Sequence, residues 1–227
     1  MPILEQQRLT AVEQRVSIEV GGSQLRGVLI VPEDAFGLVL LSSSGGRSRG
    51  GGESERVARE LEAQGLAVLH FDLLSREEAE DDDRTARLRT DICRLAGRWL
   101  GAADWAVSQQ ELRDFPLGFS SFGIAAPAAL AAAAEQPQSL SAVVCSDGRV
   151  DLAGSSLANV RVPTLLLVNA TDGPLVRANE SALLRLGHPL KELILIPQDS
   201  PFSGRTGLAT MTELAADWLG ARLIQKA

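Results

Sequence analysis

Short apolar segments recur along this chain, and helical patterns separate them. Four of the segments are almost wholly apolar and lie at residues 38–41, 66–71, 142–145 and 164–168. Strands that are apolar on both sides are typical of a parallel sheet covered on both faces. The alternation therefore predicts an α/β fold with a mostly parallel sheet and helices on both faces.

The segments around these strands predict the other elements of the sheet and its helices. Residues 16–31 alternate between apolar and polar around Gly21-Gly22-Ser23, which predicts an antiparallel hairpin at one edge. Further short strands are expected at 116–119 and 193–196, for a total of about eight. Helices are expected at 53–64, 86–109, 124–135, 176–187 and 208–224.

No internal repeat or linker rich in Pro, Gly or Ser divides the 227 residues. The sequence therefore predicts a single domain over 1–227, with residues 1–15 as an N-terminal extension and 73–85 as an acidic loop. Six carboxylates fall between Glu77 and Asp83 and could hold a divalent cation. Negative charge is also favourable before a helix N-terminus, so we expect a solvated loop without metal.

The charge balance excludes some classes of partner. Lys and Arg number 22 against 29 Asp and Glu, a net charge of −7, which disfavours nucleic-acid binding through a basic face. The sequence has no run of 18 apolar residues, and its first 15 residues lack the basic start and apolar stretch typical of a secretory signal, so we expect a cytoplasmic protein without a membrane partner. The expected partner is a small-molecule ligand or a protein, and a homodimer is compatible with the sequence.

Two cysteines, Cys93 and Cys145, make neither a disulfide framework nor a metal quartet. Free cysteine is commonly buried, so we expect both in the core. A thiol nucleophile at Cys145 would need a neighbouring cation or histidine. The sequence indicates no cofactor and no metal.

Three stretches of the chain carry the elements of a known superfamily in the same order. They read GLVLLSSSGGRSRGGGESERVARELEAQGLAVLHFDLLSREEAEDDDRT, LGFSSFGIAAPAAL, and VRVPTLLLVNATDGPLV followed by LILIPQDSPF. These stretches resemble the α/β-hydrolase superfamily, specifically small dienelactone-hydrolase-like proteins, from about residue 16 to residue 224. The resemblance implies the α/β-hydrolase fold, with an oxyanion loop, a nucleophile elbow, and acid and histidine loops in these stretches.

The elbow of this family holds a nucleophile on a tight strand-to-helix turn, where residues two before and two after it must be small. Centring the elbow on Ser120 places Phe122 two residues after it, and centring on Ser121 places Phe119 two residues before it. Only Gly123 has small residues on both sides. The resemblance therefore implies that Gly123 stands at the vestigial nucleophile position, with the positive φ that glycine adopts without strain.

The other two members of the family's triad are an acid and a histidine. Asp172 matches the acid position, and it can also cap a turn by bonding nearby backbone. Pro201 stands where the family carries histidine, which leaves a vestigial histidine position. His70 lies within a predicted strand, and His188 precedes the last strand at the opposite sheet edge, so neither is expected to replace it.

Where the family usually has a His-Gly pair after the first buried strand, this chain has serines and glycines. Loop amides there could still form an anion nest beside Arg47 and Arg49. The 42–52 loop lacks the ending of a P-loop and the spacing of a dinucleotide fingerprint. The candidate ligand-binding residues of this loop are Ser43, Ser44, Gly45, Gly46 and Arg47.

Three hypotheses for the function follow. The first is a degenerate hydrolase that keeps the fold, has lost the serine and histidine chemistry, and binds a ligand or partner. The second is an active ester or lactone hydrolase with a rearranged site that uses Ser120 or Ser121 with Asp172, although it lacks a histidine base. The third is an anion or phosphate binder built on residues 42–52.

Overall fold

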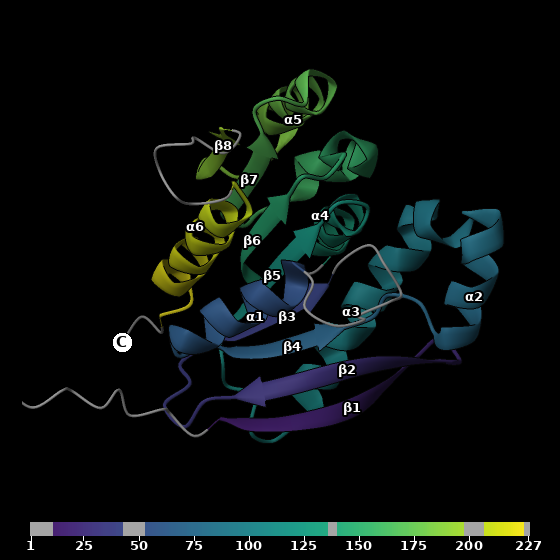
Figure 1. Ribbon diagram of the computed structural model, residues 1–227, viewed down its shortest axis with the longest axis vertical. Helices are drawn as coiled ribbons and strands as arrows, with labels where there is room; N and C mark the ends of the chain where they lie inside the picture. The colour runs from purple at the N-terminus through teal and green to yellow at the C-terminus, as the bar shows by residue number, and fades with distance from the viewer. Residues whose placement is uncertain (1–10, 43–52, 136–139, 198–206, 225–227) are drawn as a thin grey trace, which may run out of the picture.

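The computed structural model describes residues 11–42, 53–135, 140–197 and 207–224. Eight strands in these residues form one sheet of order β1-β2-β4-β3-β5-β6-β7-β8 (Figure 1). The strands are β1 (Val12–Val20), β2 (Ser23–Val31), β3 (Leu38–Ser42), β4 (Ala67–Phe71), β5 (Leu117–Phe122), β6 (Leu140–Ser146), β7 (Thr164–Asn169) and β8 (Lys191–Ile196).

The sheet is parallel from β4 through β8 and antiparallel where β2 meets β1 and β4. The predicted α/β-hydrolase fold, with about eight strands and an N-terminal antiparallel hairpin, is confirmed. Gly21 and Gly22 both have positive φ, +56° and +77°, as a two-residue hairpin turn requires. The hairpin begins at Val12, so the expectation that residues 12–15 belong to an extension is wrong.

Helices cover both faces of the sheet, as the apolar strands predicted. They are α1 (Glu53–Ala63), α2 (Arg76–Thr85), η1 (Leu88–Thr90), α3 (Ile92–Ser108), α4 (Ala125–Glu135), η2 (Val150–Asn159), α5 (Gly173–Arg185) and α6 (Gly207–Arg222). One apolar cluster joins the sheet to α1 and α6, and a second joins the opposite face to α3, α4 and α5. Figure 1 shows α1 and α6 on one side of the sheet and α3 and α4 on the other.

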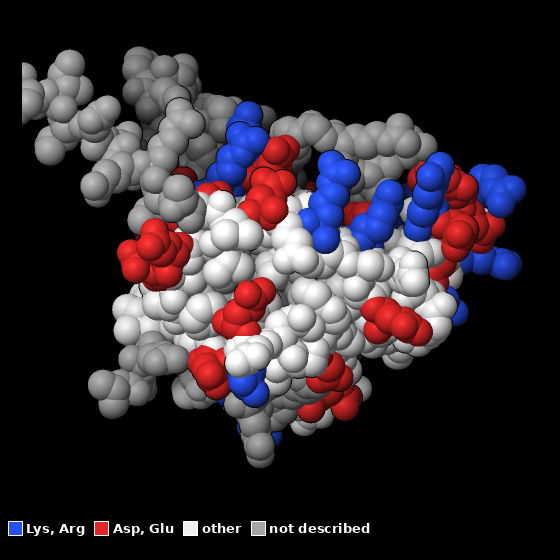
Figure 2. Space-filling model, turned by 90° about the horizontal axis from the view of Figure 1, so that it is seen from below, with Lys and Arg blue, Asp and Glu red and all other residues white. Residues whose placement is uncertain are grey.

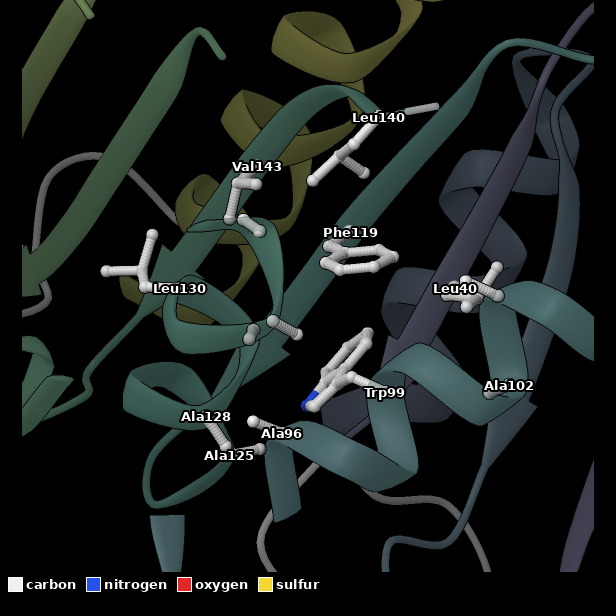
Figure 3. Packing of buried hydrophobic residues seen from close by; sticks show 14 of the residues in the cluster. Leu40, Ala96, Trp99, Ala102, Phe119, Ala125, Ala128, Leu130, Leu140 and Val143 are labelled. Atoms are coloured by element: carbon white, nitrogen blue, oxygen red, sulfur yellow. The ribbon is translucent and has the colours of Figure 1, made fainter. Parts of the chain in front are cut away.

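Trp99 of α3 is the largest fully buried side chain on the α3 and α4 face. Its ring meets Phe71 edge-on at a centroid distance of 5.2 Å and Phe119 at 4.8 Å. Figure 3 shows the indole between Phe119 of β5 and alanines of α3 and α4. Aromatic pairs at these separations contribute beyond the apolar area that they bury.

The acidic run forms a helix, so the prediction of an acidic loop at 73–85 is wrong for residues 76–85. The reason is a capping box: the Ser75 hydroxyl accepts the Glu78 N–H at 3.2 Å, and the Glu78 carboxylate accepts the Ser75 N–H at 2.8 Å. The helix ends at Ala86 in the left-handed region, and the next long helix starts only at Ile92. The described residues hold no group of three metal-ligating side chains.

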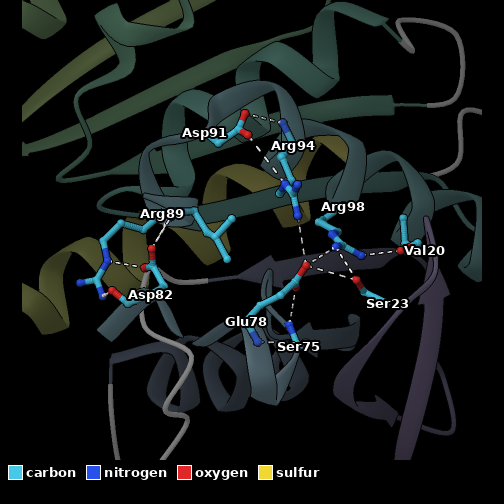
Figure 4. Close-up of polar contacts among 10 residues, drawn as sticks. Val20, Ser23, Ser75, Glu78, Asp82, Arg89, Asp91, Arg94 and Arg98 are labelled. Atoms are coloured by element: carbon cyan, nitrogen blue, oxygen red, sulfur yellow. Dashed lines mark hydrogen bonds and ion pairs between the residues drawn. The ribbon is translucent and has the colours of Figure 1, made fainter. Parts of the chain in front are cut away.

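Glu78 also anchors α2 to the hairpin through an arginine of α3 (Figure 4). Arg98, 5% exposed, donates to the Glu78 carboxylate and the Ser23 hydroxyl at 2.7 Å each, and to the carbonyl of Val20. A buried guanidinium is tolerated only when its donors are satisfied in this way. Local capping and this ion pair together explain why so acidic a segment is ordered.

Glu78→Ala should lower the free energy of unfolding by about 3–5 kcal/mol, because it leaves Arg98 buried without its carboxylate and opens the capping box. Urea denaturation measures the loss. Glu77→Ala, on the exposed side of the same turn, should change it by less than about 1 kcal/mol. Equal losses for the two variants would contradict the role given to Glu78.

Two glycines of α3 should respond oppositely to alanine. A Cβ at Gly97 would meet nothing within 4 Å, so Gly97→Ala should raise stability by about 0.5–1 kcal/mol through helix propensity. A Cβ at Gly101 would overlap the Val20 side chain of β1, so Gly101→Ala should lower stability by about 1–3 kcal/mol. Thermal unfolding of both variants checks the pair, and stabilisation by Gly101→Ala would refute the predicted overlap.

Candidate functional site at the carboxyl edge of the sheet

The carboxyl ends of β5, β6 and β7 bring several polar residues to one edge of the sheet. Gly123 follows β5, Asp147 follows β6, and Asn169 through Asp172 end β7 and lead into α5. Open α/β sheets bind ligands at this edge, because the connections to the covering helices leave a crevice there.

Gly123 forms the turn between β5 and α4. Its φ is +57°, its N–H donates to the carbonyl of Ser146 at 2.9 Å, and its carbonyl accepts the N–H of Ala126 at 3.3 Å. The positive φ expected for this residue is confirmed. A Cβ on Gly148 would lie 2.8 Å from the Gly123 carbonyl oxygen and against Ala126, so glycine at 148 allows the β6 connection to cross the turn closely.

The two candidate serines lie within β5, before the turn. Ser120 and Ser121 are both 0% exposed, and as consecutive strand residues they point to opposite faces of the sheet. The Ser121 hydroxyl donates to the Val144 carbonyl at 3.3 Å and lies 3.4 Å from the Cys145 sulfur. The Ser120 hydroxyl has no hydrogen-bond partner among the residues that the structure describes. Neither hydroxyl is presented to solvent at the carboxyl edge.

Cys145 is buried, as expected. Burial raises the pKa of its thiol to about 12 against a smaller opposing effect of the Ser121 hydrogen bond, so the thiol is protonated at neutral pH. A protonated thiol is a poor nucleophile. Cys93 is exposed, so its predicted core position is wrong, because α3 packs on the sheet through a different face that carries Leu95 and Trp99.

Asp172 is the N-cap of α5. Its carboxylate accepts the N–H of Leu175 at 3.0 Å, and Pro174 occupies the first turn, where no backbone N–H is needed. The residue is exposed. This capping interaction is a structural reason for an aspartate at position 172 that does not depend on a catalytic histidine.

Asp147, which the sequence did not single out, lies beside Asp172. Its φ is +47°, its N–H donates to Leu167 at 2.8 Å, and its carboxylate accepts the N–H of Asn169 at 2.8 Å. Partial burial of the carboxylate raises its pKa, the negative charge of Asp172 adds to the effect, and the Asn169 hydrogen bond opposes it. The signal in the sequence was an Asp-Gly pair directly after an apolar strand.

A pocket of about 550 Å³ lies over these residues. Its walls carry two carboxylates, one amide and one hydroxyl, together with apolar surface from α5. Such a lining can accept hydrogen bonds from a donor-rich or cationic molecule. The lining residues are Asp147, Asn169, Thr171, Asp172, Pro174 and Leu175.

The two histidines lie away from this pocket. His70 is on β4, and β3 separates β4 from β5. Burial lowers the pKa of His70, while the charges of Asp72 and Glu55 oppose the shift. His188 precedes β8 at the amino edge of the sheet, and its Nδ1 accepts the N–H of Leu190 at 3.0 Å. The expected edge for His188 is confirmed.

Several predicted site residues lie outside the described residues. They are the histidine-position residue Pro201 and the loop residues Ser43, Ser44, Gly45, Gly46, Arg47 and Arg49. Their assigned roles stay predictions from the sequence.

The overall fold is shared with solved structures. A dienelactone hydrolase from Anabaena variabilis ATCC 29413 is 40% identical, with a TM-score of 0.88 over 94% of this chain and 99% of that one. A cold-adapted esterase from an Arctic intertidal metagenomic library and the dienelactone hydrolase-like promiscuous phosphotriesterase P91 from metagenomic libraries have TM-scores of 0.73 and 0.74. The esterase is 20% identical and matches 96% of this chain and 96% of its own. The phosphotriesterase is 15% identical and matches 95% of this chain and 99% of its own. Both therefore show a common fold.

Two curated relatives are 34% identical over 208 residues. Both are named putative phosphoribosyl transferase and come from Mycobacterium tuberculosis, strains CDC 1551 and H37Rv. The match covers 91% of this chain and 46% of each relative, so the chain spans about half the length of the curated relatives it matches. No family model matches the sequence.

Together the sheet and its covering helices define an α/β-hydrolase-fold protein. Within that class, the 40% identity over nearly the whole of both chains shows that the chain belongs to the dienelactone hydrolase family. None of the helices in the described ranges is long and apolar enough to cross a membrane.

Asp147→Asn should raise stability at neutral pH. The raised carboxyl pKa means that wild-type stability falls as pH rises through it, and asparagine keeps the acceptor for Asn169 without the charge. The gain should vanish below the unfolded pKa of about 3.9. Urea titrations from acidic to neutral pH measure the difference in unfolding free energy between variant and wild type.

Asp151→Asn is the control with the opposite sign. The hydrogen bond and charge of Arg149 lower the Asp151 pKa, so its contribution is present above the unfolded pKa and lost as pH falls. Asp151→Asn should therefore lower stability at neutral pH. A stability loss at neutral pH for Asp147→Asn would contradict the electrostatic account of that site.

Proposed function

We propose that this protein is a non-catalytic member of the dienelactone hydrolase family, a pseudo-hydrolase that binds a small-molecule ligand or a protein partner at the carboxyl edge of its sheet. The observation that carries the proposal is Gly123 at the elbow, with a φ of +57° and no side chain to react. Hydrolases of this fold hold their nucleophile at that turn.

The chemistry of ester hydrolysis supports the proposal. A serine hydroxyl is a weak nucleophile at neutral pH and needs a base within about 3 Å. Ser120 and Ser121 are enclosed by the sheet and its helices, and the Ser121 hydroxyl is engaged with Val144 and Cys145. Loss of the serine and histidine pair removes about 10⁴–10⁶ in rate in enzymes of this mechanism.

The pocket beside the elbow is the proposed place of binding. Asp147 and Asp172 carry negative charge there, and Asn169 and Thr171 add an amide and a hydroxyl. The Asn169 side-chain oxygen accepts from the Thr171 N–H and hydroxyl at 3.0 and 2.8 Å. This lining favours a ligand with hydrogen-bond donors or positive charge over a carboxylate or phosphate.

An ester or lactone hydrolase with a rearranged site is the second candidate. The 40% identity to a dienelactone hydrolase favours it, because close relatives often share their reaction class. It would have to use Ser120 or Ser121 with Asp172, after a rearrangement that exposes a buried strand residue. The anion binder on residues 42–52 stays a prediction, because that loop lies outside the described residues except for Ser42.

The purified protein should not hydrolyse p-nitrophenyl acetate above the background of protein surface groups, and a fluorophosphonate probe should not label it. Both assays need an activated nucleophile, which Gly123 cannot supply. The Anabaena variabilis dienelactone hydrolase serves as the folded comparison in both assays. Stoichiometric labelling that is abolished by Ser120→Ala or Ser121→Ala would refute the proposal and establish the second candidate.

Restoring the missing groups tests whether the scaffold keeps the family's geometry. Gly123→Ser combined with Pro201→His should gain probe labelling, whereas Gly123→Ser alone should gain much less because it lacks a base. Gly123→Ser places a side chain at positive φ and should cost about 1–3 kcal/mol of stability, so circular dichroism must first show that both variants are folded.

A further inference from the structure

The second edge of the sheet is β8. Within the described part of the chain, β7 is its only strand neighbour, and β1 closes the opposite edge. An edge strand exposes backbone N–H and C=O groups that can pair with another chain. The two edges of this sheet differ in how far their side chains oppose such pairing.

Charged side chains protect β1. Glu13, Arg15 and Glu19 share one face of β1 with Ser17 and are exposed, so a second strand laid against β1 would meet three charges along that face. Figure 2 views the molecule from the hairpin end and shows Lys and Arg side chains together with Asp and Glu there.

The β8 edge is apolar by comparison. Its only charges are Lys191 and Glu192 at its start, and the Leu-Ile-Leu-Ile sequence that follows includes Leu195, 41% exposed. Leu184 and Leu190, beside the start of the strand, are 83% and 41% exposed. Three of the seven large apolar side chains that are exposed among the described residues therefore lie on or next to β8.

The hydrogen bonds to β7 fix which backbone groups of β8 face outward. The Leu190 carbonyl accepts the Thr164 N–H at 3.1 Å, and the Ile196 carbonyl accepts the Ala170 N–H at 2.8 Å. Because alternate residues of a strand turn their backbone groups to opposite sides, the N–H and C=O groups of Leu193 and Leu195 point away from β7.

These outward groups are self-complementary about Ile194. An antiparallel copy with Ile194 opposite Ile194 places Leu193 opposite Leu195 on both sides of the two-fold axis. Each Leu193–Leu195 pair then exchanges two N–H···O=C bonds, and only apolar side chains face one another across the central part of the strand. Odd-numbered residues of one copy lie opposite odd-numbered residues of the other. Corresponding faces of the two sheets therefore lie on the same side of the continuous sheet.

Other registers fit less well. A shift that centres the axis on Leu193 places Lys191 opposite Leu195, and the Lys191 N–H already donates to the Pro189 carbonyl at 3.1 Å. The Lys191 ammonium is likewise held by the Leu186 carbonyl at 2.8 Å. A shift of one copy by an odd number of residues would place outward-facing backbone N–H and C=O groups of one strand opposite residues of the other whose backbone groups face β7.

We propose that β8 pairs with β8 of a second copy of this chain, antiparallel about a two-fold axis at Ile194, so that two eight-stranded sheets become one continuous sheet. The occupant is a second copy because the register satisfies the free groups of both edges at once. A strand of another protein would need its own apolar pattern to do the same. Because both β8 edges are used in a two-fold dimer, no β8 edge remains through which further copies could add.

The mass in solution is the first test. Light scattering during gel filtration should give twice the chain mass of 24.1 kDa at micromolar concentration. Leu195→Lys should raise the dissociation constant of the dimer at least about tenfold, because it places a charged side chain opposite the apolar Leu193 of the other copy. Val12→Lys, at the exposed start of β1, is the matched control and should leave the dimer intact.

Cysteine cross-linking tests the register. In a Cys93→Ser background, Ile194→Cys should form an intermolecular disulfide under mild oxidation, because the two copies of residue 194 face each other. Glu192→Cys in the same background should not, because Glu192 lies opposite Ile196 and its two copies are about 13 Å apart, beyond disulfide reach. Cys145 is buried and does not interfere.

Three results would overturn the proposal. The first is a monomer at all concentrations up to about 100 µM, which would place the dissociation constant above that concentration. The second is a dimer that Val12→Lys dissociates and Leu195→Lys does not, which would place the interface at β1. The third is cross-linking at residue 192 rather than residue 194, which would show a different register or a different interface.

Discussion

The close approach of α4 to the sheet sets the geometry on which the rest of the carboxyl edge depends. Eight of its residues are buried, and six of these are alanines, so the helix backbone can pack near β5 and β6 and against α3 and η2. That approach is compatible with a sharp turn at Gly123, and with a β6 connection that crosses the turn only because residue 148 is glycine. The packing around the turn and the glycine at residue 148 therefore help to hold the elbow, together with the positive φ that Gly123 itself adopts.

The proposed pseudo-hydrolase function is consistent with the structural roles of the residues around this turn. The elbow's neighbours serve structural roles: Asp172 caps α5, and Asp147 receives the N–H of Asn169. Each of these interactions satisfies a backbone N–H that would otherwise lack a partner. A ligand at this edge would meet the carboxylates of Asp147 and Asp172, and the pKa of Asp147 is raised.

Electrostatics also orders the region that the sequence made hardest to interpret. Residues 76–85 are so acidic that solvation looked more favourable than packing. Arg98 and Arg94 of α3 and Arg89 supply positive charge to Glu78 and Asp82 at distances up to 3.3 Å. These arginines are 7 to 20 residues away in the chain, so a local pattern of charge could not show that the carboxylates would be paired.

The sequence by itself determined the layered α/β architecture, because strands buried on both faces must be apolar throughout and amphipathic helices must cover them. The resemblance of the sequence to the α/β-hydrolase family also implied the positive φ at Gly123, since only small residues fit around that family's tight turn. Tertiary structure alone decided that Asp147 lies beside Asp172, that Cys93 faces solvent, and that the acidic run is a helix. Each of these depends on which elements lie side by side, and pairing between distant segments leaves no periodic pattern in the chain.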